Sequence, residues 1–450
     1  MIVPTLLLFL LALSGSPPPG PGTAGGTEGE DAEGGVAARW TGRSSAQETP
    51  HPGESLRVIL VTVGQGDAVW ERFGHNAIWI QDAETGRGTA YNWGIFDFRQ
   101  ANFFSRLVKG EMLYKMAPVD PFASLEEYRQ ANRRVWIQEL ALTPDQKLDL
   151  LTFVEWNALP ENRDYRYDYY RDNCSTRVRD ALDRVLGGAL RRNTRDVVTP
   201  HTYRWHTRRL LQGVAWAYTG IQVVLGPRAD VRLSAWEEMF LPQRLMDHIR
   251  DVRIPDPESP DGGFRSLVTG ERLFLESDRS PIPRRAPFRL PWFLLLGVAG
   301  AGITVALTRG TGEMGRGRRL GLTVFAGGWA LVASLAGLLL AGAWLFTDHV
   351  FWYRNYNLFQ MSPLFLPLPL AFVPFLFRGR FPRWGRDVAL VLAGLAVTGS
   401  LVELVPGLGQ ANGEIVALSL PLNLALAWTG VVLRERTKKD AEERAPRRSP

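Results

Sequence analysis

The sequence predicts an α+β extramembrane domain over residues 55–250, followed by an all-α membrane domain with five spans over residues 290–434. Almost all of the long uncharged apolar runs fall after residue 290, whereas the first 250 residues are rich in Arg, Asp and Glu. The mean hydropathy of −0.10 is therefore an average over two unlike halves. With 450 residues, the chain is long enough for two or three domains.

The N-terminus predicts export. Residues 1–16 contain a short apolar run, Ile2–Leu13, and then the small residues Ser14-Gly15-Ser16, as in a signal peptide, although the usual basic start is missing. Residues 17–54 are rich in Pro, Gly and Glu, with little to bury, which predicts a disordered linker.

Strand-like and helix-like patterns follow one another in the extramembrane domain. Apolar runs between Gly-rich turns predict three strands, and apolar spacing with capping residues predicts three helices. The strands are Val58–Val61, His75–Ile80 and Gly88–Trp93, and the helices are Leu125–Arg134, Thr143–Asn157 and Ser175–Leu186. Gly187-Gly188 ends the last helix. Residues 251–289 are Pro-rich and predict a linker with a small hairpin near Leu267–Glu271.

Five apolar segments form the predicted membrane domain. About 20 residues are needed to cross a bilayer, and the third and fourth segments are short for that length. The segments are Pro291–Leu307, Leu320–Phe346, Pro363–Phe377, Val388–Leu401 and Ile415–Leu433. The alternative is that they are buried helices of a large soluble protein.

Basic residues decide the orientation. They cluster in the first and third loops and after residue 433, whereas the second and fourth loops are nearly free of them. Since positive loops stay in the cytoplasm, the tail over residues 435–450 is predicted to be cytoplasmic and the preceding domain extracytoplasmic. The net charge of +6 is explained by these clusters, so nucleic-acid binding is not expected. The single cysteine excludes an intrachain disulfide and a cysteine-based metal site.

Cys174 is the candidate nucleophile. It stands just before an amphipathic helix, where free N–H groups and the helix dipole stabilise a thiolate and can hold an oxyanion. Arg171 and Arg177 are expected to lower the thiol pKa further. The alternative is a small buried filler, but its polar Asn/Ser/Thr neighbours argue against an apolar setting.

His75 is the candidate base. It begins a predicted strand after Phe73-Gly74, and the alternative is a hydrogen-bonded histidine of the core. Asn92 is the candidate for orienting the ring, with Asp97 or Asp67 as alternatives. His201 and His206 have a spacing that does not suit two ligands on one helix face, so a surface or interface role is expected and no metal site.

The second loop of the membrane domain contains His349, Asn355 and Asn357 among aromatic residues. An aromatic belt at the membrane interface explains the Trp, Tyr and Phe residues without a further function. It does not explain the His and Asn residues, which are expected to bind a lipid head group or to shape the active site.

The order His75, Asn92, Cys174 resembles that in circularly permuted papain-like domains of the NlpC superfamily. More closely, Phe73–Ala77, Tyr91–Phe98 and Asp172–Arg177 resemble segments of the Lnb-type bacterial lipoprotein N-acyltransferases. Those proteins also have a multi-span domain whose outer loop contains His and Asn, which His349, Asn355 and Asn357 match. The resemblance extends over about residues 55–435.

This resemblance implies a function at the bacterial cytoplasmic membrane. Cys174, assisted by His75, would take an acyl chain from a phospholipid as a thioester and pass it to the α-amine of a diacylated lipoprotein, with no cofactor. Two alternatives stay open because fold alone does not determine the reaction. One is a membrane-anchored papain-like cysteine peptidase or hydrolase of the cell envelope, and the other is a non-enzymatic scaffold.

Overall fold

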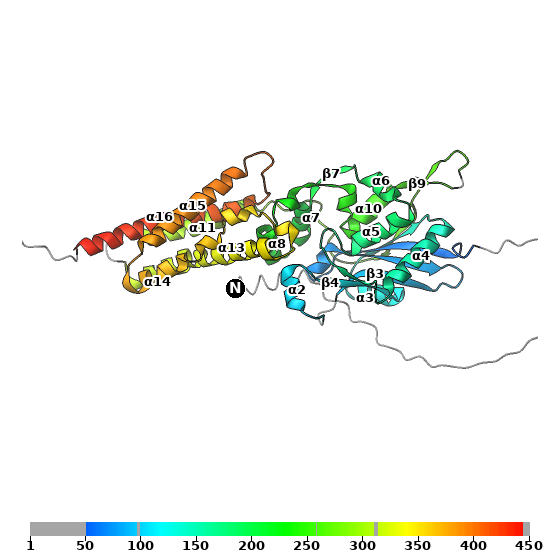
Figure 1. The fold of residues 1–450 in the computed structure, drawn as a ribbon, viewed down its shortest axis with the longest axis horizontal. Helices are drawn as coiled ribbons and strands as arrows, with labels where there is room; N and C mark the ends of the chain where they lie inside the picture. The colour runs from blue at the N-terminus through cyan, green and yellow to red at the C-terminus, as the bar shows by residue number, and fades with distance from the viewer. Residues whose placement is uncertain (1–50, 97–99, 258, 310–313, 444–450) are drawn as a thin grey trace, which may run out of the picture.

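The computed structural model describes residues 51–96, 100–257, 259–309 and 314–443 (Figure 1). The predicted signal-like segment lies outside the described residues, as does the predicted linker apart from residues 51–54. In Figure 1 the sheet domain and the long membrane helices occupy opposite ends of the molecule.

A seven-stranded antiparallel sheet forms the extramembrane domain, in the order β11-β5-β1-β2-β3-β4-β6. Its strands are β1 (Leu56–Val63), β2 (His75–Asp82), β3 (Gly88–Phe96), β4 (Leu113–Val119), β5 (Val135–Leu140), β6 (Asp164–Arg166) and β11 (Val268–Leu275). The three predicted strands are confirmed, since they lie within β1, β2 and β3.

Both faces of this sheet are covered, which explains why β1 is apolar along most of its length. On one face Val58, Leu60 and Ile78 belong to the main core. On the other face Ile59 and Val61 pack in a smaller cluster with residues that include Leu125 of helix α3. A strand that is buried on both faces needs apolar residues in succession rather than in alternation.

Nine helices belong to the extramembrane domain in the described chain, and capping residues determine where α3 and α4 begin. They are α2 (Phe103–Lys109), α3 (Pro121–Gln130), α4 (Pro144–Ala158), α5 (Cys174–Val185), α6 (Ala189–Thr194), α7 (Tyr203–Leu211), α8 (Ala215–Val224), α9 (Ala235–Glu238) and α10 (Pro242–Arg250). The capping box of Thr143 and Gln146 is confirmed at α4. Helix α3 begins and ends four residues earlier than predicted, because Asp120 caps it with bonds from the N–H groups of Phe122 and Ala123.

The region after residue 250 differs from its prediction. The hairpin expected near Leu267–Glu271 is wrong, because Val268 begins β11, which pairs with β5 at the edge of the large sheet. The small hairpin consists instead of β9 (Arg253–Pro255) and β10 (Phe264–Ser266). The sheet domain therefore extends to Leu275. Strands β7 (Val198–Thr202) and β8 (Arg232–Ser234) form a further pair.

Four helical stretches of the described chain are long and apolar enough to cross a membrane. They are α11 (Leu290–Thr308), the stretch Arg316–Phe346 that ends in α13 (Gly328–Phe346), α15 (Arg383–Val402) and α16 (Gly413–Glu443). The third predicted span is a pair bent by 48°, Tyr356–Phe365 with α14 (Leu368–Arg378), so the number of five spans stays a prediction. Large apolar side chains such as Leu296 and Phe377 are 63% and 76% exposed, as is typical of a lipid-facing surface.

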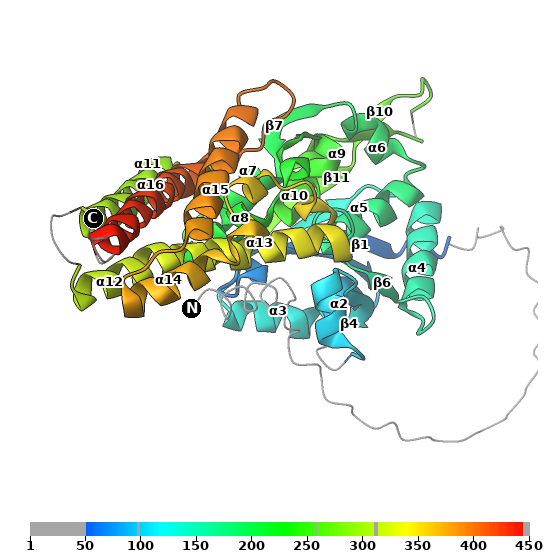
Figure 2. The same ribbon diagram turned by 60° about the vertical axis from the view of Figure 1, so that its left-hand side comes forward.

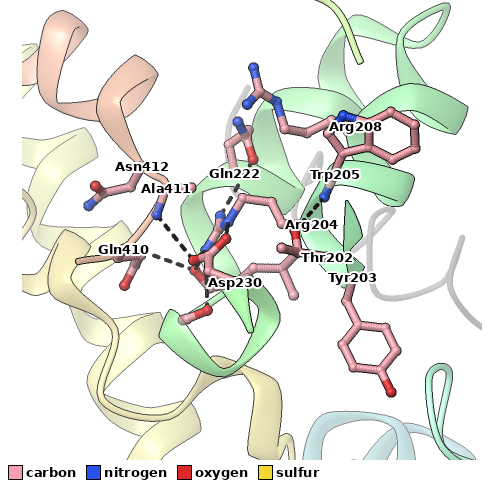
Figure 3. Close-up of polar contacts among 12 residues, drawn as sticks. Thr202, Tyr203, Arg204, Trp205, Arg208, Gln222, Asp230, Gln410, Ala411 and Asn412 are labelled. Carbon is pink, nitrogen blue, oxygen red and sulfur yellow. Dashed lines mark hydrogen bonds and ion pairs between the residues drawn. The ribbon is translucent and has the colours of Figure 1, made fainter. Parts of the chain in front are cut away.

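Polar contacts join the extramembrane domain to the membrane domain. Helices α11 and α16 lie side by side (Figures 1 and 2), and the segment before α16 reaches the extramembrane domain. Arg204, only 1% exposed, donates to both oxygens of Asp230 at 2.7 and 3.0 Å. Asp230 also accepts the backbone N–H of Ala411 at 3.1 Å (Figure 3). A buried ion pair of this kind holds the segment before α16 against the extramembrane domain.

Candidate active site

Cys174 is the first residue of α5, so the helix begins one residue earlier than predicted. The side chain of Asn173 caps this helix by accepting hydrogen bonds from the N–H groups of Ser175 and Thr176 at 2.9 and 3.0 Å. Thr176 Oγ1 accepts the N–H of Asn173 in return, at 2.8 Å. This reciprocal cap determines where the helix starts and therefore where the thiol stands.

A buried hydrogen bond brings the start of α5 to the start of β2. Ser175 Oγ donates to Asn76 Oδ1 at 2.9 Å, across 99 positions of sequence. Asn76, with 0% exposure, is itself held by a bond from its Nδ2 to Thr62 Oγ1 at 2.8 Å. The residues just before this pair are Cys174 and His75, so the contact brings the start of the helix with the thiol to the start of the strand with the imidazole.

His75 contacts Asn92, the predicted orienting residue. The ring Nε2 lies 2.8 Å from Asn92 Oδ1. Because an amide oxygen can only accept, Nε2 carries the proton and Nδ1 is left as the basic nitrogen. Of the two alternatives, Asp67 pairs with Arg279 and Asp97 lies outside the described residues.

Gly94 lets the thiol approach the sheet. It lies where the pairing of β3 with β4 shifts register between Asn92 and Ile95, and its φ is +92°. A Cβ at this position would stand 3.3 Å from the Cβ of Cys174. The bulge and the missing side chain together leave room for the nucleophile.

The thiol pKa differs from its prediction. Burial raises the pKa of Cys174, against the opposing effect of the backbone N–H groups of Asn76, Ser175 and Cys174 and of the Arg133 charge. The prediction of a lowered pKa is therefore wrong, because desolvation outweighs the helix start. Arg177 is instead paired with Asp172, and Arg171 lies over the Phe351 ring at 4.9 Å.

The imidazole is neutral at pH 7. Burial lowers the pKa of His75 to about 4, although the hydrogen bond to Asn92 raises it. Both the thiol and the imidazole are therefore neutral at pH 7, and no direct hydrogen bond joins them among the described residues. Such pairs commonly tighten only when substrate binds. The arrangement suits proton transfer during attack rather than a preformed ion pair.

Two further residues act on the site and escaped the sequence prediction. Arg133 is 6% exposed, donates to Gly64 O at 3.0 and 2.9 Å, and favours the ionised form of Cys174. The hydroxyl of Tyr165 is buried with no hydrogen-bond partner among the described residues and would lie 4.0 Å from a Cβ on Gly94. Arg133 lies between α3 and β5, far from Cys174 in sequence, and Tyr165 lies in the short strand β6, so no helix or strand periodicity points to either residue.

The loop before α14 contacts the segment that leads to Cys174. His349 stacks on Trp352, with ring centroids 4.5 Å apart, and its Nε2 lies 3.3 Å from Leu107 O. It lines a small cavity together with Tyr167 and Tyr169. The loop therefore supports the chain just before the nucleophile, and a role of His349 in substrate binding stays a prediction.

Asn355 and Asn357 are buried, with 2% and 0% exposure. Asn355 Nδ2 donates to the carbonyls of Val223 and Val224 at 2.9 and 2.8 Å, at the end of α8. Asn357 Nδ2 donates to Val223 O at 2.8 Å, and its Oδ1 accepts from Asn412 at 2.8 Å. These contacts favour a structural role at the junction of the two halves, and a role in substrate binding stays a prediction.

Three histidines meet at one buried carboxylate, Glu238, which is 2% exposed. His201 and His206 lie 2.7 and 2.8 Å from its Oε1, and His248 lies 2.8 Å from its Oε2. The predicted surface or interface role is wrong for His206, which has 0% exposure.

The atoms of His201, His206 and Glu238 lie within 4.8 Å of one another, as in a metal site. Arg209, however, donates to His206 Nδ1 at 3.2 Å, so Nε2 must carry the proton and cannot bind a cation. The cluster is a hydrogen-bonded support for Glu238.

Comparison with known proteins supports the predicted family. Residues 47–211 match the family model of the Lnb N-terminal periplasmic domain. The match includes His75, Asn92 and Cys174 and ends with α7, before the membrane helices. No curated protein and no solved structure shows a significant match to the chain. This chain is therefore a multi-pass membrane protein with an extracytoplasmic Lnb-type periplasmic domain, and its predicted resemblance to the Lnb-type lipoprotein N-acyltransferases is confirmed over that domain.

Proposed function

We propose that this protein moves an acyl chain from a phospholipid to the α-amine of a diacylated lipoprotein, with Cys174 as the acyl carrier. The observation that supports the proposal most directly is the Ser175 to Asn76 hydrogen bond of 2.9 Å, which joins the start of α5, where Cys174 stands, to the start of β2, where His75 contacts Asn92. The membrane helices anchor the extramembrane domain at the bilayer. The proposed acyl donor and acceptor are also held in the bilayer, so this anchoring supports the proposal. The circularly permuted papain-like architecture remains part of the proposal.

In the first half-reaction, Nδ1 of His75 takes the proton of Cys174 as the sulfur attacks the ester carbonyl carbon of the lipid. The C–S bond forms, the C–O bond breaks, and His75 returns the proton to the departing lysophospholipid oxygen. In the second half-reaction, the lipoprotein amine attacks the thioester carbonyl. His75 takes a proton from the amine, the C–S bond breaks, and the sulfur leaves and is protonated again.

Each attack places negative charge on the carbonyl oxygen. The N–H groups of Cys174 and Asn76 point toward the thiol and are not used by the Asn173 cap, and the Tyr165 hydroxyl offers a further donor. Burial raises the pKa of Tyr165, so this hydroxyl keeps its proton at neutral pH and can donate it to a hydrogen bond. These groups are the proposed oxyanion donors.

The test is direct detection of the acyl-enzyme. Purified full-length protein is incubated with phospholipid labelled in its acyl chain, and we expect hydroxylamine-sensitive label on the peptide that contains Cys174. A synthetic diacylated lipopeptide should then remove the label and become N-acylated. Label that persists on Cys174→Ala at the wild-type level would refute the mechanism. Cleavage of muropeptides without any thioester would favour the peptidase alternative.

A further inference from the structure

An open cavity of about 520 Å³ lies between the end of β1, helix α10 and the segment that leads to α11. Its charged lining consists of five arginines and one carboxylate: Arg134, Arg209, Arg244, Arg279, Arg284 and Asp247. The backbone of Gly64 and the ring of Trp136 complete one wall. Such an excess of cations around one hollow creates a site for an anion.

Some of these arginines already have carboxylate partners. Arg279 pairs with Asp67, and Arg244 lies 3.3 Å from Asp247. Arg134, Arg209 and Arg284, in contrast, have no carboxylate partner among the described residues. Arg134 donates to the carbonyl of Ser277 at 3.0 Å, which leaves its charge uncompensated.

Arg209 is the strongest indication of a ligand. Its side chain is 6% exposed, and it donates to Pro283 O at 3.1 Å and to His206 Nδ1 at 3.2 Å. Its Nε is buried with no hydrogen-bond partner among the described residues. Burial lowers the pKa of Arg209 to about 10, so it stays charged at neutral pH. A buried guanidinium with a free donor is costly unless an anion completes it.

The cavity borders both the membrane anchor and the catalytic residues. Its lining includes residues 277–284, and the first membrane helix begins at Leu290. On the other side, the carbonyl of Gly64 accepts two bonds from Arg133, the cation that acts on Cys174. Val63, the neighbour of Gly64, pairs with His75. One strand end therefore separates the cavity from the catalytic pair.

We propose that this arginine-lined cavity binds the phosphodiester head group of the phospholipid that donates the acyl chain. Guanidinium groups bind phosphate oxygens through paired N–H donors, and Arg134, Arg209 and Arg284 provide such donors around one space. The identification of the lipid as the acyl donor rests on the proposed function. Free phosphate has the same chemistry, and the experiment separates the two sources.

Binding is measured by calorimetry on the full chain in detergent, in a Cys174→Ala background so that the lipid is not consumed. The probes are dihexanoyl phosphatidylglycerol and inorganic phosphate. The test variant is Arg134→Gln with Arg284→Gln, of which Arg134 is partly exposed and Arg284 is exposed. The matched control is Arg285→Gln, an exposed neighbour that does not line the cavity.

We expect the lipid to bind the test variant at least about tenfold more weakly, as the loss of hydrogen bonds to a charged group predicts. The control should bind as the parent protein does, and phosphate should compete only weakly. Unchanged lipid affinity in the test variant, or an equal loss in the control, would overturn the proposal. Phosphate that binds as tightly as the lipid would overturn the head-group assignment.

The outcome is separable from that of the proposed function. If the wild-type protein forms the thioester but its lipid affinity does not depend on Arg134 and Arg284, the cavity is not the head-group site. The proposed acyl transfer is then unaffected. If lipid binding depends on these arginines but no thioester forms, the head-group site is supported and the proposed acyl transfer is refuted. Equal thermal stability of the test variant and Arg285→Gln verifies that both proteins are folded.

Discussion

At the scale of single residues, the contact between His75 and Asn92 determines which ring nitrogen is free to accept a proton. With Nε2 bound to the amide oxygen at 2.8 Å, Nδ1 is the nitrogen that can act as the proposed base. We expect His75→Gln to lower kcat by about 10²- to 10⁴-fold, which is the usual contribution of a general base.

Asn92→Ala should lower kcat less than His75→Gln does, because the ring is still present but loses its orientation. Asn92→Asp keeps an acceptor and adds a negative charge that stabilises the imidazolium. It should therefore recover part of kcat and move the acidic limb of the pH–rate profile to higher pH. A wild-type rate and pH profile for Asn92→Ala would show that the contact does not position the base.

Gly94 is the second residue at this scale, because its positive φ and its lack of a side chain both matter beside Cys174. Gly94→Ala would place a methyl group 3.3 Å from the Cβ of Cys174, on a backbone with φ +92°. We expect a loss of about 1–2 kcal/mol of stability from the backbone alone, together with a fall in kcat.

The control for this substitution is Gly86→Ala, which has φ +71° and no heavy atom within 4 Å of the added Cβ. It carries the backbone cost without touching the thiol, so it should lower Tm and leave kcat unchanged. Equal kcat values for the two variants would contradict a steric role of Gly94.

At the scale of elements, the cap of α5 links stability to catalysis. Asn173 accepts two N–H groups, and its Nδ2 donates to the carbonyls of Tyr169 and Phe240, both at 3.0 Å. Asn173→Ala should cost about 2–3 kcal/mol, from the lost cap and the buried carbonyls left without a donor. Because the thiol is the next residue, kcat should also fall.

Thr143→Ala is the matched control for this cap. Thr143 and Gln146 form the same capping box at α4, away from the thiol. Chemical denaturation should show a cost of about 1 kcal/mol, with kcat unchanged. The idea that the cap positions the nucleophile fails if Asn173→Ala and Thr143→Ala have the same kcat.

At the scale of the whole molecule, stability should depend on pH through two histidines, the buried His206 and the partly buried His75. Burial lowers the pKa of both His75 and His206 to about 4. In the unfolded chain each regains a pKa near 6.5. Between these values the unfolded state binds more protons than the folded state, so stability is complete above pH 6.5 and falls as the pH drops toward 4.

The measurement is Tm of the full chain across this pH range. His206→Gln removes one of the two titrating groups and should make the fall of Tm shallower. A flat Tm in the wild type between pH 6.5 and 4 would contradict the burial of neutral histidines.

The hydrogen-bonded cluster around Glu238 connects the extramembrane domain to the arginine cavity. Although burial raises it, the hydrogen bonds from His206 and His248 hold the pKa of Glu238 well below its usual value. Glu238 supports His206, His206 accepts from Arg209, and Arg209 reaches the segment before α11. The cluster thus belongs to the tertiary frame rather than to one element.

Local patterns in the sequence predicted several strands and helix caps of the extramembrane domain. The runs that became β1, β2 and β3, the capping box of Thr143 and the cap before Cys174 all depend on residues within a few positions of one another. The prediction that Cys174, His75 and Asn92 belong to one site rests on the family resemblance, because the strand and the helix are about a hundred positions apart.

Only the tertiary structure decided the remaining features. The pairing of β11 with β5, the approach of Arg133 to the thiol, the meeting of three histidines at Glu238 and the arginine cavity all join distant segments. Local periodicity contains no information on such contacts. The direction of the Cys174 pKa belongs with them, since desolvation depends on everything that packs around the sulfur, whereas the sequence shows only the helix on which it stands.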